Sequence, residues 1–282
     1  MEIRDEIRIG LNPIFHTVIF QMKKQKKKFY FFLGVVILVA FLVGYLLQLI
    51  PGNLLSDTQA DFFRGGLGFI SYITLIAACL FFSGIICSEF DKKTGFIVFP
   101  KINKYKLILG KYLGNLILVV SIVAIYYFLL ALLGFYYYGG PINDRLFYSF
   151  GFAVLYVVAL GSFVTLFSSF LRSVTITIII TLIILFFGLN IADSIVVLIF
   201  KDAFEPLYSL TYLSNLITSI LQNPFPNPRY VEYSIPIPGA MGGDFTISSW
   251  LTPSIGMGIT LFIVYIVAFF VLAALLFKRR QL

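Results

Sequence analysis

The sequence predicts an all-α integral membrane protein whose chain crosses the bilayer six times. Hydrophobic residues make up 60% of the 282 positions and charged residues only 12%, whereas soluble domains carry about a quarter charged residues. The apolar residues are also gathered in runs of the length that a spanning helix needs, about 20 residues. Residues 1–282 are therefore predicted to form one transmembrane domain.

Six apolar runs account for the predicted spans. All six are long enough to cross the bilayer, and Asp193 in the fifth is the one charged residue inside them. The first run ends at Pro51-Gly52, and the last ends at a basic cluster. The predicted spans are 29–50, 65–88, 112–143, 146–171, 173–200 and 253–277.

The placement of the basic residues predicts the orientation of the chain. The net charge of +8 would suit a nucleic-acid partner, but the basic residues are confined to short segments between the apolar runs. Seventeen of the 21 lie before the first span, between spans two and three, between spans four and five, or after span six. Because cytoplasmic loops carry the excess of Lys and Arg, we expect a plasma-membrane protein with both termini in the cytoplasm and no nucleic-acid partner.

The segment 11–28 predicts an amphipathic helix in the cytoplasmic interface. Asn12 is a suitable N-cap, and Pro13 suits the first helical position. The lysines that follow would contact anionic lipid headgroups. The alternative is a soluble helix packed on a partner. The apolar residues that share one face are Leu11, Ile14, Phe15, Val18, Ile19 and Met22.

The external loop 201–252 joins spans five and six. Its first half, 204–221, is apolar at helical spacing but too short and too polar to span, with Pro206 in its first turn. This predicts a re-entrant or interfacial helix that caps the transport pathway. The part from Pro224 to Gly243 is rich in Pro and Gly and is predicted to be irregular. The candidate external gate residues are Leu207, Leu210, Leu213 and Ile217.

The cytoplasmic segment 88–106, between spans two and three, predicts a coupling element. It mixes charges of both signs with the apolar cluster 96–99, which a solvated loop does not need. A short element that docks a soluble partner would use it, and the alternative is packing against the chain's own N-terminal helix. Asn103 can cap the helix of span three. The candidate coupling residues are Glu89, Lys92, Lys93, Thr94, Gly95, Phe96, Phe99, Pro100 and Lys104.

At these residues the chain resembles the permease subunits of ABC-2 type ABC transporters. The resemblance extends over the chain in its layout of an N-terminal helix, six spans and a large loop before the last span. The Thr-Gly order and the short distance to the proline are similar to an archaeal branch. The Arg that often follows the proline is absent, and Lys101 and Lys104 are the nearest substitutes. The matching positions are Glu89, Thr94-Gly95, Phe96–Phe99, Pro100, Lys104 and Gly110-Lys111.

This resemblance implies an exporting permease that pairs with a second copy or a related chain. A separate ABC ATPase subunit would bind ATP and Mg²⁺ and drive it. The chain itself lacks the Gly-x-x-x-x-Gly-Lys-Ser/Thr loop that cradles phosphates, because Gly110-Lys111 is followed by Tyr112. We therefore expect no catalytic residue, no metal and no cofactor on this chain.

Two polar residues in span five are the remaining candidates. Asp193 can reach headgroups or Asn190, and its predicted role is structural. The scarcity of intramembrane charge favours a hydrophobic or amphipathic substrate, such as a lipid, a peptide or a drug. One alternative is a membrane scaffold or assembly protein without transport. Another is a membrane-embedded enzyme, which would need convergent His, Asp or Glu on several spans.

Overall fold

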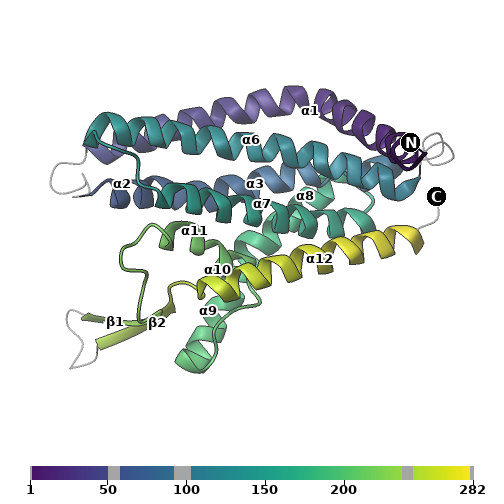
Figure 1. Ribbon diagram of the computed structural model, residues 1–282. Coiled ribbons are helices and arrows are strands. Elements are labelled where there is room, and N and C mark those ends of the chain that lie inside the picture. Colours follow the sequence, from purple (N-terminus) through teal and green to yellow (C-terminus); the bar gives the residue numbers. More distant parts are fainter. Residues whose placement is uncertain (1, 50–57, 92–102, 237–243, 280–282) are drawn as a thin grey trace.

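The computed structural model describes residues 2–49, 58–91, 103–236 and 244–279 of the chain. Its helices form an elongated bundle (Figure 1), with a small β-hairpin at one end. Six stretches in this part of the chain are long and apolar enough to cross a membrane, which confirms the multi-pass helical prediction. They are Pro13–Gly44, Gln59–Asp91, Lys104–Tyr138, Arg145–Phe170, Val174–Ala203 and Ile255–Arg279.

The bundle is built around α3 (Ile70–Phe82), which contacts α6 (Lys104–Tyr138), α7 (Arg145–Phe170) and α8 (Val174–Ile183). α2 (Gln59–Gly66) and the 3-10 turn η1 (Leu67–Phe69) lead into it, and α4 (Cys87–Asp91) follows it. Asn103 caps α6 as predicted, since its side-chain oxygen accepts from Tyr105 N at 3.0 Å. α12 (Ile255–Arg279) packs along α7 on the other side of the bundle.

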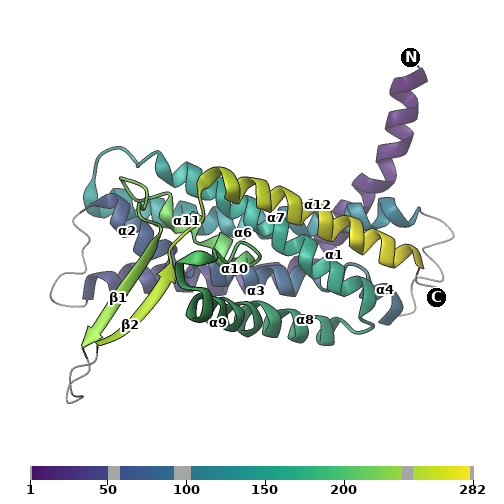
Figure 2. The same cartoon turned by 90° about the horizontal axis from the view of Figure 1, so that it is seen from below.

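Helix α1 (Glu2–Leu49) packs along α6 and is continuous from the N-terminal region into the first span. The predicted N-cap at Asn12 is wrong, because the helix begins at Glu2 and passes through Pro13. A proline inside a helix removes one hydrogen bond and tends to bend it. In Figure 2 the N-terminal part of α1 leaves the bundle at a steep angle.

Span five contains a turn that the sequence did not predict. α8 passes into a π-helical turn, η2 (Ile184–Gly188), then α9 (Leu189–Phe200) and a 3-10 turn, η3 (Lys201–Ala203). A π-turn inserts an extra residue into a helix and is common at functional sites. The side chain of Leu185 in this turn is fully buried, while Phe187 is 63% exposed.

The external segment differs from its prediction. Helix is confined to α10 (Leu210–Ser214) and α11 (Leu216–Ser219), so a single helix over 204–221 is wrong. The Ser209 hydroxyl accepts from Tyr212 N at 3.3 Å and starts α10. Both pieces pack against α7. Gly258 of α12 allows the approach of α11, because a Cβ atom there would lie 2.2 Å from Leu216 Cδ1.

A β-hairpin replaces part of the region predicted to be irregular. β1 (Tyr230–Pro236) pairs antiparallel with β2 (Asp244–Trp250), and Tyr230 lies opposite Trp250. Their rings contact at 5.3 Å between centroids. Alternating aromatic and β-branched residues favour strand pairing, and this signal outweighs the Pro and Gly content that predicted a loop.

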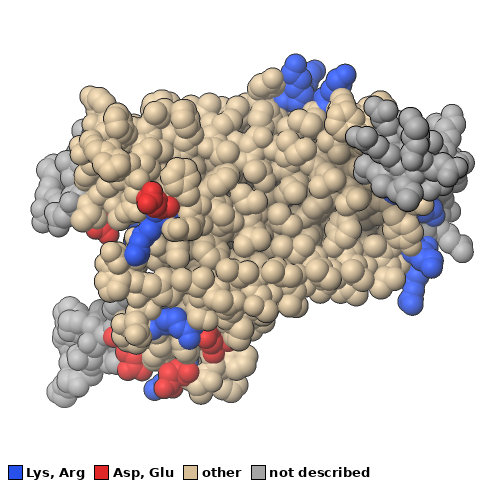
Figure 3. All heavy atoms as spheres, viewed as in Figure 1, with Lys and Arg blue, Asp and Glu red and all other residues tan. Residues whose placement is uncertain are grey.

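The two termini lie at the same end of the bundle, opposite the hairpin (Figure 1). In Figure 3 the middle of the visible face carries no charged side chain, and its acidic side chains lie at the hairpin end. The basic end includes the exposed lysines of α1 and the Lys278-Arg279 pair that closes α12. This arrangement agrees with an even number of spans.

A labelling experiment tests the orientation of these ends. Asp61 and Asp144 are exposed at the hairpin end, while Lys26 and Arg279 are exposed on the basic elements. Single cysteines at the first two positions, in a background with Cys79 and Cys87 replaced by alanine, should react with an impermeant maleimide added to intact cells. Cysteines at the last two should react only after lysis. If the cysteine at position 279 reacted in intact cells, the chain would have the opposite orientation.

Candidate functional site at the basic end

The second membrane stretch is broken between α3 and α4. Residues 83–86 are not helical, and they contain Gly84 followed by two β-branched residues, all weaker helix formers than Ala or Leu. A broken helix releases backbone N–H and C=O groups from its own ladder. Away from water each unpaired group costs several kcal/mol, so neighbouring elements must supply partners.

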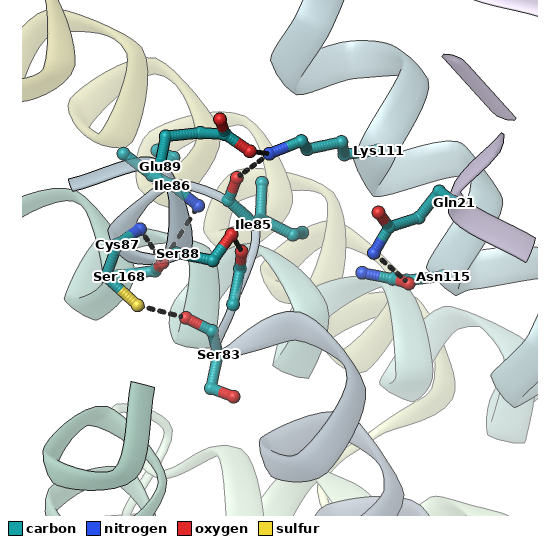
Figure 4. A network of polar contacts seen from close by, with 11 residues as sticks. Gln21, Ser83, Ile85, Ile86, Cys87, Ser88, Glu89, Lys111, Asn115 and Ser168 are labelled. Atoms are coloured by element: carbon teal, nitrogen blue, oxygen red, sulfur yellow. Dashed lines mark hydrogen bonds and ion pairs between the residues drawn. The ribbon is translucent and has the colours of Figure 1, made fainter. Parts of the chain in front are cut away.

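Side chains of α6 and α7 provide those partners (Figure 4). Asn115 Nδ2 donates to the Phe81 carbonyl at 2.8 Å, and Lys111 Nζ donates to the Ile85 carbonyl at 3.1 Å. The Ser168 hydroxyl accepts from the backbone N–H groups of both Ile86 and Cys87, at 3.1 and 3.0 Å. The break is therefore held from two helices rather than left to solvent.

An ion pair between Glu89 and Lys111 completes this arrangement. The two side chains point toward one another in Figure 4, and the residues are 7% and 4% exposed. Glu89 belongs to α4 and Lys111 to α6, so the pair joins the end of the second stretch to the beginning of the third. Removing one member of a buried pair leaves an uncompensated charge, which costs about 3–5 kcal/mol.

Helix α1 joins the same network through a polar face. Gln21 Nε2 donates to Asn115 Oδ1 at 3.0 Å. α1 can approach closely because α6 has glycines here: a Cβ atom at Gly110 would lie 2.7 Å from Thr17 Cβ, and one at Gly114 would lie 3.0 Å from Gln21 Cβ. The face of α1 that packs is therefore Thr17, Gln21 and Gln25, whereas Phe15 is 62% exposed.

Both ends of the predicted coupling segment also contact α12. The Phe90 ring of α4 lies 6.2 Å from the Phe277 ring, between centroids, in an edge-on arrangement. Lys104 Nζ at the start of α6 lies 5.7 Å from the centroid of the same ring, a cation–π geometry. Helices α4 and α6, which precede and follow the coupling segment, therefore both contact Phe277 of α12.

Of the predicted coupling residues, the structure describes only Glu89 and Lys104. Glu89 faces inward to Lys111, and Lys104 lies beside Phe277. Sequence reasoning overlooked the bonding roles of Gln21, Asn115 and Ser168; Asn115 was detectable as a lone amide four residues after Lys111 in an apolar run. The predicted residues outside the described part of the chain are Lys92, Lys93, Thr94, Gly95, Phe96, Phe99 and Pro100.

The polar residues of span five lie at the other end and have different partners from those expected. Asp193 Oδ2 accepts from the Ser209 hydroxyl at 2.6 Å and from the Thr211 hydroxyl at 3.3 Å. The Asn190 amide donates to the Phe186 carbonyl at 2.7 Å instead of to Asp193. Asp193 therefore fixes the beginning of α10, which agrees with a structural role.

An ion pair and a hydrogen bond of Glu205 fix the external segment next to these residues. The Glu205 carboxylate accepts from Arg229 at 2.7 Å and from the Tyr212 phenol at 2.8 Å. Burial, together with the hydrogen bond to Glu205, raises the pKa of Tyr212, so this phenol stays protonated and keeps donating. The candidate gate residues pack here inside the chain, with Leu210, Leu213 and Ile217 at 2% exposure or less and Leu207 half-buried.

Double substitution tests the ion pair. Lys111→Met alone removes the cation that pairs with the buried carboxylate of Glu89 and should lower the unfolding free energy by about 3–5 kcal/mol. Adding Glu89→Leu should restore most of the loss, because no buried charge remains. Thermal unfolding of the purified protein in detergent measures both, with Lys26→Met on the exposed part of α1 as the control. Strictly additive losses would show that the two side chains are not coupled.

Among the described residues, no group of three or more His, Cys, Asp or Glu side chains could hold a metal ion. The site instead consists of one ion pair, two amides and a hydroxyl that join α1, α4, α6 and α7 through the bonds described above. This arrangement suits the mechanical linkage of helices. No protein-family model matches the chain, and no curated protein matches it either.

Proposed function

We propose that this chain is the permease subunit of an ATP-driven transporter of the ABC-2 type. The observation that carries the proposal is the Glu89–Lys111 pair at the base of the predicted coupling segment. A partner that pushes on this segment acts on α4, which is bonded to α6 through Lys111 and to α7 through Ser168. The resemblance of residues 89–111 to that family supports the same assignment.

The proposed mechanism transmits force through rigid helices. Two cytoplasmic ATPase subunits bind ATP with Mg²⁺, close, and move the segment 89–106 of each permease copy. Bistable packed elements move as units rather than bending continuously. The bonds of Asn115 to Gln21 and to the Phe81 carbonyl extend the moving unit to α1 and α3. The contact of Lys104 with Phe277 adds α12.

This function assigns sides and partners to the chain. The basic end faces the cytoplasm, so both termini and the ATPase are on that side of the plasma membrane. The N-terminal part of α1 lies in the interface with membrane lipids, which its exposed Phe15 and Phe20 side chains would contact. A second copy, or a related chain, completes the transport pathway.

The substrate of the proposed transporter is hydrophobic or amphipathic, and the direction is outward by analogy with the family. Within the described spans, Asp193 is bonded to the chain's own hydroxyls and Lys111 is paired. An ion path would need further polar groups. The external gate would involve Leu207, which is half-buried, more directly than Leu213, which is fully buried.

Loss of docking tests the proposal. Affinity purification of the chain from its native membranes should co-purify an ABC ATPase, and substrate should stimulate its ATP hydrolysis. Phe96→Ala with Phe99→Ala should weaken this association about 30-fold, because interface aromatics contribute about 2 kcal/mol or more. Phe147→Ala with Tyr148→Ala at the hairpin end is the matched control, since both side chains are exposed.

Two results would contradict the assignment. The first is that no ATPase accompanies the intact protein in gentle detergent. The second is that the Phe96/Phe99 variant retains full ATPase association and stimulation. Retained insertion of all spans, checked by the labelling experiment above, separates a docking defect from misfolding.

A further inference from the structure

Helices α10 and α11, which lie in the half of the molecule that carries the hairpin (Figure 2), help to line a polar pocket. Its volume is about 160 Å³, and it opens between η1, α3, α7, the π-turn η2, α9, α10 and α11. A water molecule occupies only about 30 Å³ of liquid. No charged side chain is among the lining residues. The hydroxyl and amide side chains that line it include Ser71, Tyr156, Asn190, Ser214, Asn215 and Thr218.

Tyr156 brings an unused hydrogen-bond donor to this pocket. Its side chain is 0% exposed, and no partner of its phenol group meets strict hydrogen-bond geometry; the Ser214 hydroxyl, which lines the same pocket, is its one weak neighbour among the described residues. Buried polar groups are normally paired. A buried phenol facing a polar pocket is therefore a group that a ligand would satisfy.

The other polar groups of the pocket have already used hydrogens on the protein. The Ser214 hydroxyl donates to the Thr211 carbonyl at 2.7 Å, and the Thr218 hydroxyl donates to the Asn215 carbonyl at 3.2 Å. The Asn215 amide donates to the Leu251 carbonyl at 3.0 Å. Their side-chain oxygens keep lone pairs that can accept, and the amides of Asn190 and Asn215 each keep a second N–H, so the pocket combines several donors, the Tyr156 phenol among them, with several acceptors.

This combination selects the chemistry of the ligand. An ammonium group would serve the acceptors but cannot accept from Tyr156. A phosphate or carboxylate would accept from Tyr156 but would face the remaining oxygens without a cation. A hydroxyl group both donates and accepts. A neutral group with several hydroxyls satisfies the whole lining.

The mouth of the pocket is apolar. Tyr72 is 50% exposed and stacks on Phe186 of the π-turn, with 5.7 Å between ring centroids and 15° between planes. Phe69 and Phe187, which flank lining residues in the chain, are 52% and 63% exposed. An alkyl chain leaving the pocket past Tyr72 and Phe186 would therefore meet aromatic side chains.

We propose that this pocket binds the neutral, polyhydroxylated headgroup of an amphipathic molecule whose hydrocarbon tail lies in the bilayer. The phenol of Tyr156 donates to a headgroup hydroxyl, and the oxygens of Ser214, Thr218 and Asn215 accept from others. The further assignment of this amphiphile as the transported substrate rests on the proposed transport function. The binding itself does not.

Photocrosslinking tests the binding without any ATPase. The purified chain in phosphatidylcholine nanodiscs is titrated with an alkyl glucoside that carries a diazirine in its tail. Matched probes have the same tail with a sulfate or trimethylammonium head. The glucoside should label the peptides around Phe69 and Phe187 saturably, and the charged probes should label them at least tenfold more weakly.

Tyr156→Phe should weaken glucoside binding about fivefold to tenfold, the worth of one hydrogen bond. It should not lower the thermal unfolding temperature of the ligand-free protein, since the phenol makes no strong hydrogen bond within the chain. Tyr136→Phe is the matched control, because that residue is 80% exposed on α6. Non-saturable labelling, equal labelling by all three probes, or unchanged affinity in Tyr156→Phe would each overturn the proposal, while the docking experiment would still report on transport.

Discussion

A membrane-spanning chain cannot leave backbone groups unpaired. In this chain the constraint falls on the break at residues 83–86, where the helix cannot pair its own backbone groups. The carbonyls of Phe81 and Ile85 and the N–H groups of Ile86 and Cys87 must be satisfied by other helices. Asn115, Lys111 and Ser168 do so. The positions of α6 and α7 against the central helix at this end therefore depend on those bonds.

The same bonds explain why the basic end is suited to transmit motion. Lys111 has two functions there, since it pairs with Glu89 and also caps the Ile85 carbonyl. A displacement of α4 would break both interactions unless α6 moved with it. The glycines at 110 and 114 bring α1 into the same unit through contacts with Thr17 and Gln21. The opposite end is organised differently, by Asp193 and by the Glu205–Arg229 pair around short helices and a hairpin.

The two ends divide the proposed work of the molecule. The basic end joins helices through a buried ion pair and side-chain bonds to the backbone, while the pocket beside the π-turn is lined by neutral polar groups that include the Tyr156 phenol. A buried polar group without a good partner is costly, which is why the proposed ligand is placed at Tyr156, whereas the bonds of Lys111, Asn115 and Ser168 connect one helix to another. Both features come from helices that depart from regular α geometry.

The sequence by itself determined the six spans, the arrangement of basic residues and the cap at Asn103, because these depend on local composition and spacing. Only the tertiary structure decided which groups meet. Glu89 of α4 pairs with Lys111 of α6, a contact between two helices that no local pattern predicts. The polar face of α1 is buried because two glycines lie on another helix. The pocket takes its lining from seven elements, so it cannot be deduced from any one segment.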